Sequence, residues 1–248
     1  MKVSIITVSL NSTRTIEDCI KSVVNQSYKN IEYIIIDGGS TDETLDIIKK
    51  YANKISFWIS EKDYGIYDAM NKGINLATGE IVGIINSDDI YADDYVIDKI
   101  VEFITKKNVH TCYGNLIYID QKNTNRIIRF WRSGKYSKAK FKRGWMPPHP
   151  TFFVKNQIYK TYGSFNLKFP IIADYELMLR FLYKHNISTV YIPKVLVKMR
   201  TGGESRPSII NVINNSISCY RAWKENGLGP NPITFLLKPL SKMNQFLK

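Results

Sequence analysis

Two adjacent carboxylates, Asp88 and Asp89, follow a short apolar run at residues 81–85 and could bind a divalent cation. An apolar run of this length predicts a strand, and in an open α/β sheet ligands bind beyond the carboxyl ends of the strands. Carboxylate oxygens are hard ligands for Mg²⁺ or Mn²⁺, and these ions in turn hold the phosphates of a nucleotide. The plainer alternative is a polar turn in which an aspartate caps the next helix.

Two earlier predicted strands also end in polar side chains. Asn11 follows a strand at residues 3–9, and Asp37 closes a strand at residues 31–37. Helical periodicity separates the strands up to residue 89, and this alternation predicts a parallel sheet with right-handed crossovers. We therefore expect these side chains to share one sheet edge with Asp88 and Asp89. No GxGxxG or GxxxxGK[ST] loop is present, so a phosphate at this edge would be held by a metal and side chains.

The second half of the chain is less regular. Its predicted elements are a helix at 93–106, strands at 111–119 and 127–131, a buried helix opening at residue 172, a strand at 195–199 and a helix at 209–223. Three prolines between residues 145 and 153 exclude a helix and predict a stiff, extended segment. The expected fold class is α/β, with a mixed, mainly parallel sheet flanked by helices and a basic, helical C-terminal extension.

Composition and charge limit the possible functions. The 248 residues are 44% apolar, enough for one large domain, and the net charge is +13. Residues 121–144 contain nine Lys and Arg side chains and no acid, a surface suited to phosphorylated molecules, nucleic acid or anionic lipid. Three widely spaced cysteines form no CxxC, which favours a reducing, cytoplasmic location. No apolar run approaches the ~18–20 residues of a membrane span.

Five sequence blocks resemble one known family. They are residues 3–11, 36–42, 65–74, 77–79 together with 86–89, and 173–177. In this order they are similar to the inverting glycosyltransferases of family 2, which have the GT-A fold. The blocks at residues 36–42 and 65–74 resemble bacterial enzymes that build capsule, O-antigen or exopolysaccharide repeat units. The resemblance covers roughly residues 1–205.

The resemblance implies a metal-dependent hexosyltransferase that moves a sugar from a UDP- or GDP-sugar to a hydroxyl of a glycan or lipid-linked saccharide. It implies that Asp174 is the general base and that Asp89 ligates Mn²⁺ or Mg²⁺. His149 is a second candidate metal ligand, although an acceptor contact or a structural hydrogen bond is an equal alternative. The candidate nucleotide-sugar contacts are Thr7, Val8, Asn11, Asp37, Asn71, Lys72, Ser87 and Asp88.

Two residues depart from the family pattern. Gly38 stands where many relatives have a second acid that contacts the base, which leaves the choice between UDP and GDP open. Asn86 stands where relatives often begin the metal motif with aspartate, so more depends on Asp89.

The expected domains are a catalytic domain at 1–205, with a nucleotide half (1–110) and an acceptor half (111–205), and the extension at 206–248. Apolar and basic residues alternate in the extension, a pattern that fits an anionic membrane surface or packing on the domain. Two other functions are weighed. A nucleotidyltransferase would need a glycine-rich basic loop after the first strand, where residues 9–12 are Ser-Leu-Asn-Ser. A nucleic-acid-binding protein is suggested by net charge alone, and we expect no nucleic-acid partner.

Overall fold

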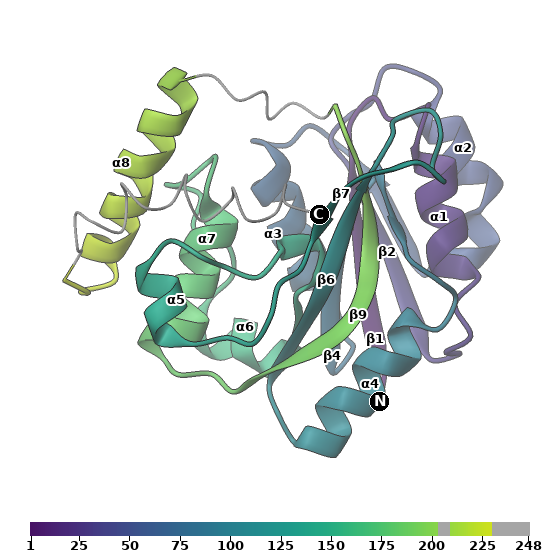
Figure 1. Cartoon of the computed structure of the whole chain (residues 1–248). Coiled ribbons are helices and arrows are strands. Elements are labelled where there is room, and N and C mark those ends of the chain that lie inside the picture. Colours follow the sequence, from purple (N-terminus) through teal and green to yellow (C-terminus); the bar gives the residue numbers. More distant parts are fainter. Residues whose placement is uncertain (203–208, 230–248) are drawn as a thin grey trace.

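A computed structural model describes residues 1–202 and 209–229 of the chain, with one sheet carrying helices on both faces (Figure 1). The strands are β1 (Val3–Ser9), β2 (Ile31–Asp37), β3 (Phe57–Ser60), β4 (Ile81–Asn86), β5 (Asp89–Tyr91), β6 (Thr111–Ile119), β7 (Ile127–Trp131), β8 (Phe153–Lys155) and β9 (Thr189–Arg200). The α-helices are α1 (Ile16–Val24), α2 (Thr44–Lys50), α3 (Ile66–Leu76), α4 (Val96–Lys107), α5 (Lys138–Lys142), α6 (Asn156–Tyr162), α7 (Ala173–Met178) and α8 (Ile209–Glu225). The predicted α/β class is confirmed.

The sheet has the strand order β3-β2-β1-β4-β8-β6-β9-β5, and β7 pairs with β6. The first four strands in space are parallel, as the alternation of strand and helix predicts. The sheet becomes mixed at β8, which is antiparallel to both β4 and β6. The carboxyl ends of β1, β2, β3 and β4 therefore meet at one edge, where Asn11, Asp37, Ser87, Asp88 and Asp89 lie.

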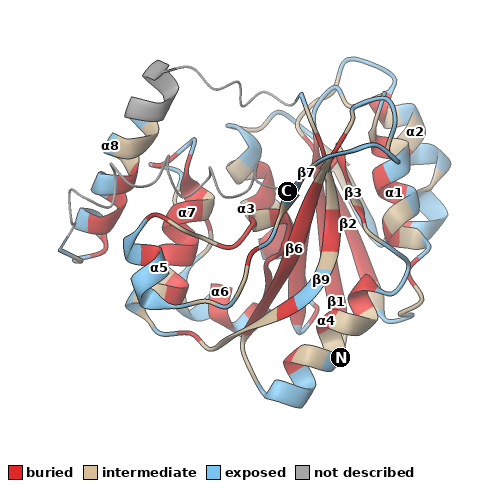
Figure 2. Ribbon diagram, viewed as in Figure 1, coloured by how far each residue is buried: buried red, intermediate tan, exposed pale blue. Residues whose placement is uncertain are grey.

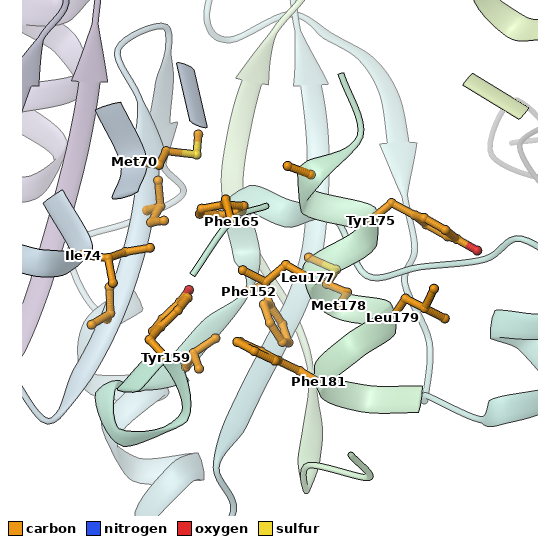
Figure 3. Packing of buried hydrophobic residues seen from close by; sticks show 14 of the residues in the cluster. Met70, Ile74, Phe152, Tyr159, Phe165, Tyr175, Leu177, Met178, Leu179 and Phe181 are labelled. Atoms are coloured by element: carbon orange, nitrogen blue, oxygen red, sulfur yellow. The ribbon is translucent and has the colours of Figure 1, made fainter. Parts of the chain in front are cut away.

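Alternate residues of the central strands face two separate hydrophobic clusters. Ile6 and Val8 of β1 pack in the cluster that α3, α6 and α7 cover, drawn in Figure 3. Val3 and Ile5 point the other way, toward α1 and α4. The strands are consequently buried on both faces (Figure 2), which explains why they are nearly continuous in apolar residues.

Helix α8 packs against α7 through the C-terminal turns of α8. Cys219, Ala222 and Trp223 are buried, and the indole of Trp223 donates a 2.8 Å hydrogen bond to the hydroxyl of Tyr175 on α7. Within the predicted extension, the structure describes residues 209–229. The expected amphipathic stretch at 235–248 lies outside the described residues. No helix among the described residues combines the length and hydropathy needed to cross a bilayer.

The proline-rich segment differs from its prediction. Instead of being extended throughout, it contains one 3₁₀ turn at His149–Thr151, and β8 and α6 follow directly. Pro150 lies in the first positions of that turn, where its fixed φ and missing N–H cost nothing. The sequence patterns also missed α5, because elements of three to seven residues are too short to show periodicity.

Candidate active site

Asp89 lies at the junction between β4 and β5 and is fully buried. Its Oδ2 accepts a 3.3 Å hydrogen bond from the side-chain amide of Asn86. Asp89 Oδ1 and Asn86 Oδ1 are also buried, yet neither has a hydrogen-bond partner among residues 1–202 and 209–229. Burial, and then the charge of the neighbouring Asp88, raise the pKa of Asp89 well above its usual value. Among the described residues, the junction thus holds two unpaired acceptor oxygens, one of them on a buried carboxyl group.

Unpaired buried oxygens of this kind suit a divalent cation. No cluster of three or more His, Cys, Asp or Glu side chains that could hold a metal occurs among residues 1–202 and 209–229. An ion at Asn86 and Asp89 would therefore complete its coordination with phosphate oxygens and water. Mg²⁺ and Mn²⁺ commonly bind in this way, through one or two protein oxygens and a substrate phosphate. The residues present fit such an ion.

Arg200, at the end of β9, is a site residue that the sequence patterns missed. Its side chain is only 4% exposed, and it donates to the backbone oxygen of Asp88 at 2.9 Å and to Asp18 at 2.5 Å. Its charge lowers the pKa of both Asp88 and Asp89, but burial outweighs it at each carboxylate. The sequence signal that could have indicated Arg200 is its position as the last residue of a strand, shortly before Gly202.

The ends of β1 and β4 are tied together beside this junction. The amide of Ser87 donates to the backbone oxygen of Val8 at 3.2 Å, and the hydroxyls of Ser87 and Ser12 lie 2.7 Å apart. Thr7 is fully buried, and its hydroxyl lies 3.0 Å from the hydroxyl of Tyr33. A nucleotide contact from Thr7 would therefore have to use its backbone. The predicted contacts of Thr7, Val8 and Ser87 stay predictions.

Asp37 is buried at the end of β2 and uses both carboxylate oxygens inside the protein. Oδ1 accepts from the hydroxyls of Ser9 and Ser40 at 2.9 and 2.5 Å. Oδ2 accepts from the amides of Gly39 and Ser40 and from the hydroxyl of Ser60 at 2.7 Å. Burial alone would raise the pKa of Asp37, but these bonds outweigh it and hold the pKa below its usual value. This geometry makes Asp37 the support of the turn at residues 38–40.

Three other predicted contacts also have internal partners. Asn11 adopts φ 48°, and its side-chain oxygen accepts from the amide of Thr41 at 2.9 Å. Lys72 pairs with Glu61 at 2.8 Å. Asn71 bonds to the backbone N–H and carbonyl of Phe165, both at 2.9 Å, and so fixes the loop before α7 to α3. Their contacts with a donor stay predictions.

Asp174 stands in the first turn of α7. Its Oδ1 accepts from the hydroxyl of Tyr67 on α3 at 3.2 Å and from the amide of Tyr175 at 2.8 Å. In the described part of the chain, no hydrogen bond reaches Asp174 Oδ2. Burial, followed by the charge of Asp174, raises the pKa of Tyr67, so its hydroxyl stays protonated and donates. One carboxylate oxygen is held, and the other has no hydrogen-bond partner among the described residues.

His149 belongs to the neighbourhood of Asp174. Its ring lies edge-on to Phe165, with centroids 5.5 Å apart. Burial lowers the pKa of His149, and the charge of Asp174 only partly offsets this, so the imidazole is neutral. Among the described residues, His149 makes no hydrogen bond with Asp89 or Asn86. Its metal-ligand role stays a prediction.

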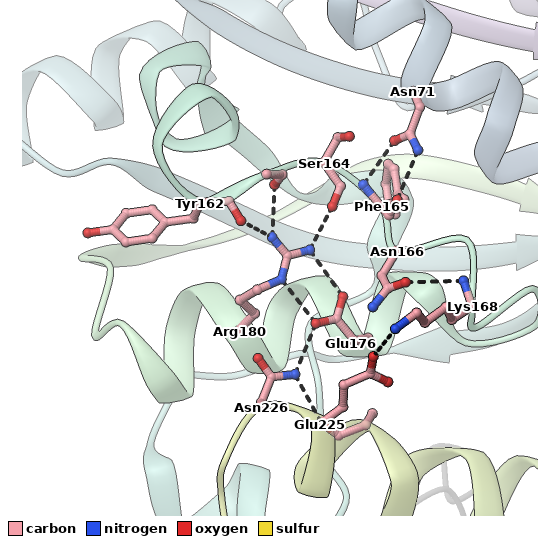
Figure 4. A network of polar contacts seen from close by, with 12 residues as sticks. Asn71, Tyr162, Ser164, Phe165, Asn166, Lys168, Glu176, Arg180, Glu225 and Asn226 are labelled. Atoms are coloured by element: carbon pink, nitrogen blue, oxygen red, sulfur yellow. Dashed lines mark hydrogen bonds and ion pairs between the residues drawn. The ribbon is translucent and has the colours of Figure 1, made fainter.

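A polar network behind α7 holds that helix in place (Figure 4). Arg180 donates to both carboxylate oxygens of buried Glu176, at 3.0 and 3.1 Å, and to the backbone oxygens of residues 162–164. Asn226, just after α8, donates to Glu176 at 3.0 Å. The helix that carries Asp174 is thus fixed to the preceding loop and to the C-terminal helix.

Comparisons with known proteins agree with this geometry. The family model described as glycosyl transferase family 2 matches residues 4–162. A PGL/p-HBAD biosynthesis glycosyltransferase of Mycobacterium bovis is 28% identical over 212 residues, 84% of this chain and 80% of that protein. An uncharacterized glycosyltransferase of Mycobacterium tuberculosis is 33% identical over 185 residues, 72% of this chain and 68% of that protein.

Solved structures show the same fold. S. aureus TarS in complex with UDP-GlcNAc superposes with a TM-score of 0.68 at 18% identity, over 91% of this chain and 65% of the TarS chain. The mannosyltransferase PcManGT of Pyrobaculum calidifontis, in complex with GDP-Man and Mn²⁺, gives a TM-score of 0.65 at 17% identity, over 99% of this chain and 69% of that chain. The chain belongs to glycosyl transferase family 2, has a GT-A-type fold and is a glycosyltransferase enzyme.

Proposed function

We propose that this protein is a metal-dependent, inverting hexosyltransferase that uses a nucleotide-diphosphate sugar. The observation that carries the proposal is the buried junction of Asn86 and Asp89, with two unpaired oxygens at the carboxyl edge of a parallel sheet. The bound ligands of the two structural neighbours, UDP-GlcNAc in one and GDP-Man with Mn²⁺ in the other, support a donor of this class. Neither the nucleotidyltransferase nor the nucleic-acid alternative gains support from the described residues.

Asp89 and Asn86 would hold Mn²⁺ or Mg²⁺, and Asp88 would contact the donor. The bound ion supplies stabilisation of the charge that develops on the departing diphosphate. Arg200 keeps the Asp88 backbone in place from behind, through its 2.9 Å bond to the carbonyl oxygen.

Asp174 would act as the general base for the acceptor hydroxyl. Tyr67 and the amide of Tyr175 hold Oδ1, and Oδ2 can accept the proton of the acceptor hydroxyl as that oxygen attacks the anomeric carbon. One displacement with one base inverts the configuration of the sugar. This differs from the two-carboxylate nucleophile and acid pair of retaining hydrolases.

The proposed acceptor is a glycan or lipid-linked saccharide of bacterial surface polysaccharide, such as capsule or O-antigen. The basic surface at residues 121–144 supports this proposal. Within it β7 exposes Ile127, Ile128 and Phe130 beside Arg129 and Arg132, a combination suited to an anionic membrane surface. The protein would then work in the cytoplasm, peripherally on the inner face of the membrane.

Thermal melting with UDP, GDP, CDP and ADP, each with and without Mn²⁺, tests the proposal. A ligand at about 100 times its Kd stabilises by about 2.7 kcal/mol, roughly 5–10 °C for a chain of this size. We expect a Mn²⁺-dependent rise with one of these nucleotides, and NMR of the transferred sugar should show the inverted anomer. Absence of any metal-dependent shift, together with no transfer from the matching donors, would rule the function out.

A further inference from the structure

The loop between β3 and α3 places a carboxylate directly over Gly38. A β-carbon built on Gly38 would lie 3.1 Å from Asp63 Cγ and 2.5 Å from Asp63 Oδ2, and the second distance is closer than real β-carbons approach a neighbour. A side chain at residue 38 and the Asp63 carboxylate in its present position therefore exclude each other. The Asp63 carboxylate can occupy this position because Gly38 has no side chain.

The loop is held in this position by several bonds. The amide of Glu61 donates to the backbone oxygen of Asp37 at 3.0 Å, and the amide of Gly38 donates to the backbone oxygen of Ser9 at 2.8 Å. Asp63 Oδ1 accepts from the amide of Gly65 at 2.9 Å. Among the described residues, no hydrogen bond reaches Asp63 Oδ2. One oxygen anchors the carboxylate and the other is left as an acceptor above the turn at residue 38.

The position of this acceptor fits the base of a nucleotide. Gly38 follows β2, and the Asn86–Asp89 junction follows β4, with β1 between them. Two strand spacings are about 10 Å, comparable with the length of a nucleoside. With its diphosphate at the junction, a donor lying across the strand ends would bring its base to Gly38 and Asp63.

We propose that Asp63 selects the donor base by accepting a hydrogen bond from a ring N–H, which uracil and guanine possess. The proposal rests on the proposed function, because it assumes a nucleotide at this edge. Uracil offers N3–H, and guanine offers N1–H with its adjacent amino group. Cytosine and adenine present a ring nitrogen acceptor at that place, which a carboxylate repels. The protein therefore uses a UDP- or GDP-sugar and rejects CDP and ADP.

Asp63→Asn tests the chemistry with little change in shape. The side-chain oxygen of asparagine must stay toward the amide of Gly65, so its NH₂ faces the base. Binding of the preferred nucleotide with Mn²⁺, measured by calorimetry, should weaken about tenfold to a hundredfold, the loss of one charge-assisted hydrogen bond. Binding of CDP should improve relative to the preferred nucleotide. Pyrophosphate, which has no base, should bind the variant and the wild type equally.

Gly38→Ala tests the geometry without removing the carboxylate. Gly38 is not at positive φ, so the backbone accepts alanine, and the new methyl group displaces the Asp63 carboxylate from its position. We expect the same loss of base preference as in Asp63→Asn. The double change Gly38→Asp with Asp63→Ala returns a carboxylate to the same space from β2 and should restore part of the preference. Asp46→Asn, at an exposed carboxylate on α2, is the matched control.

Each other outcome counts against the inference. Equal weakening of pyrophosphate and all nucleotides in Asp63→Asn would show a structural role and overturn base selection. Unchanged preference in Asp63→Asn, or a wild type that favours CDP or ADP, would overturn it as well. A wild type that binds neither pyrophosphate nor any nucleotide with Mn²⁺ would remove the proposed function itself, and this inference with it.

Discussion

Two buried carboxylates lie at opposite edges of the same parallel strands. Glu32 is the second residue of β2, at the amino edge, where it accepts hydrogen bonds from Lys2 at 2.5 Å, from the hydroxyl of Ser4 at 2.5 Å and from the amide and hydroxyl of Thr78. Asp89, at the carboxyl edge, accepts a 3.3 Å hydrogen bond from Asn86, and among the described residues its Oδ1 has no hydrogen-bond partner.

Their pKa shifts differ in the same way. Burial raises the pKa of both groups, but the bonds to Glu32 outweigh burial and lower its pKa to about 2, whereas the pKa of Asp89 rises well above its usual value. Removing one partner of a paired buried charge destabilises the fold, whereas carboxylates with strongly perturbed pKa values cluster at functional sites. The same distinction separates Glu176, which is paired by Arg180 and Asn226, from Asp174, one oxygen of which has no partner in the described part of the chain.

Asp89→Asn changes the carboxylate at the carboxyl edge and should have the largest effect on activity. The variant loses the carboxylate that would hold the ion, and a bound ion is worth several kcal/mol in the transition state. Sugar transfer should fall by about a thousandfold, and Mn²⁺ should no longer raise the Tm with nucleotide. The metal-free variant should be at least as stable as the wild type, because an unpaired buried charge is removed.

Measurements of kcat and of urea unfolding on the same samples check the expected loss of activity and the expected retention of stability. A variant that keeps Mn²⁺-stimulated transfer would show that Asp89 is not the metal ligand. A variant that unfolds much more easily would show that the carboxylate is structural.

Glu176→Gln should give the largest loss of stability. The change leaves Arg180, whose side chain is 13% exposed, without its carboxylate partner, and breaking a buried ion pair on one side costs about 3–5 kcal/mol. The Cm for urea unfolding measures this loss. Glu225→Gln is the control, because its pair with Lys168 is exposed and should contribute nothing measurable. Equal stability of the two variants would contradict the structural role of the Figure 4 network.

Glu32→Gln should show the opposite pattern from Asp89→Asn, with stability lost and activity kept. The folded pKa of about 2 lies below the ordinary value of 4.5, and a difference of this size corresponds to roughly 3 kcal/mol as an upper bound. Because the folded pKa is depressed, this stabilisation is present above about pH 4.5 and is lost as the pH falls toward 2. Urea unfolding at pH 7, 5 and 3.5 should therefore show a gap between wild type and variant that narrows with acidity.

Glu80→Gln is the control for this experiment, because Glu80 lies at the same edge but its side chain is 62% exposed. A gap that stays constant from pH 7 to 3.5 would show that Glu32 acts through packing, not through its charge.

The carboxyl edge was predictable because it follows from local patterns. Strands β1, β2 and β4 are long and apolar, and the rule for strand ends brings Asn11, Asp37 and Asp88 together from the sequence alone. The partners of these residues were not predictable, because they lie far along the chain. Arg200 is 112 residues from Asp88, and Tyr67 is 107 residues from Asp174. Such pairings depend on the packing of the second half, where short elements such as β8 carry no periodicity.

Tyr67→Phe is the smallest change and the finest test of the distinction between paired and unpaired carboxylates. It removes the 3.2 Å bond that holds Asp174 Oδ1, while the ring stays packed on Phe165 at 5.2 Å. The bond is long for one to a carboxylate, so we expect the contribution of a typical hydrogen bond, about 0.5–1.5 kcal/mol, and a fall in kcat of about twofold to tenfold. The KM for the donor and the Tm should hardly change, because the bond orients the base and does not contact the nucleotide. A raised donor KM with unchanged kcat would instead show that Tyr67 contacts the donor. That outcome would contradict the proposal that Tyr67 positions Asp174 as the base.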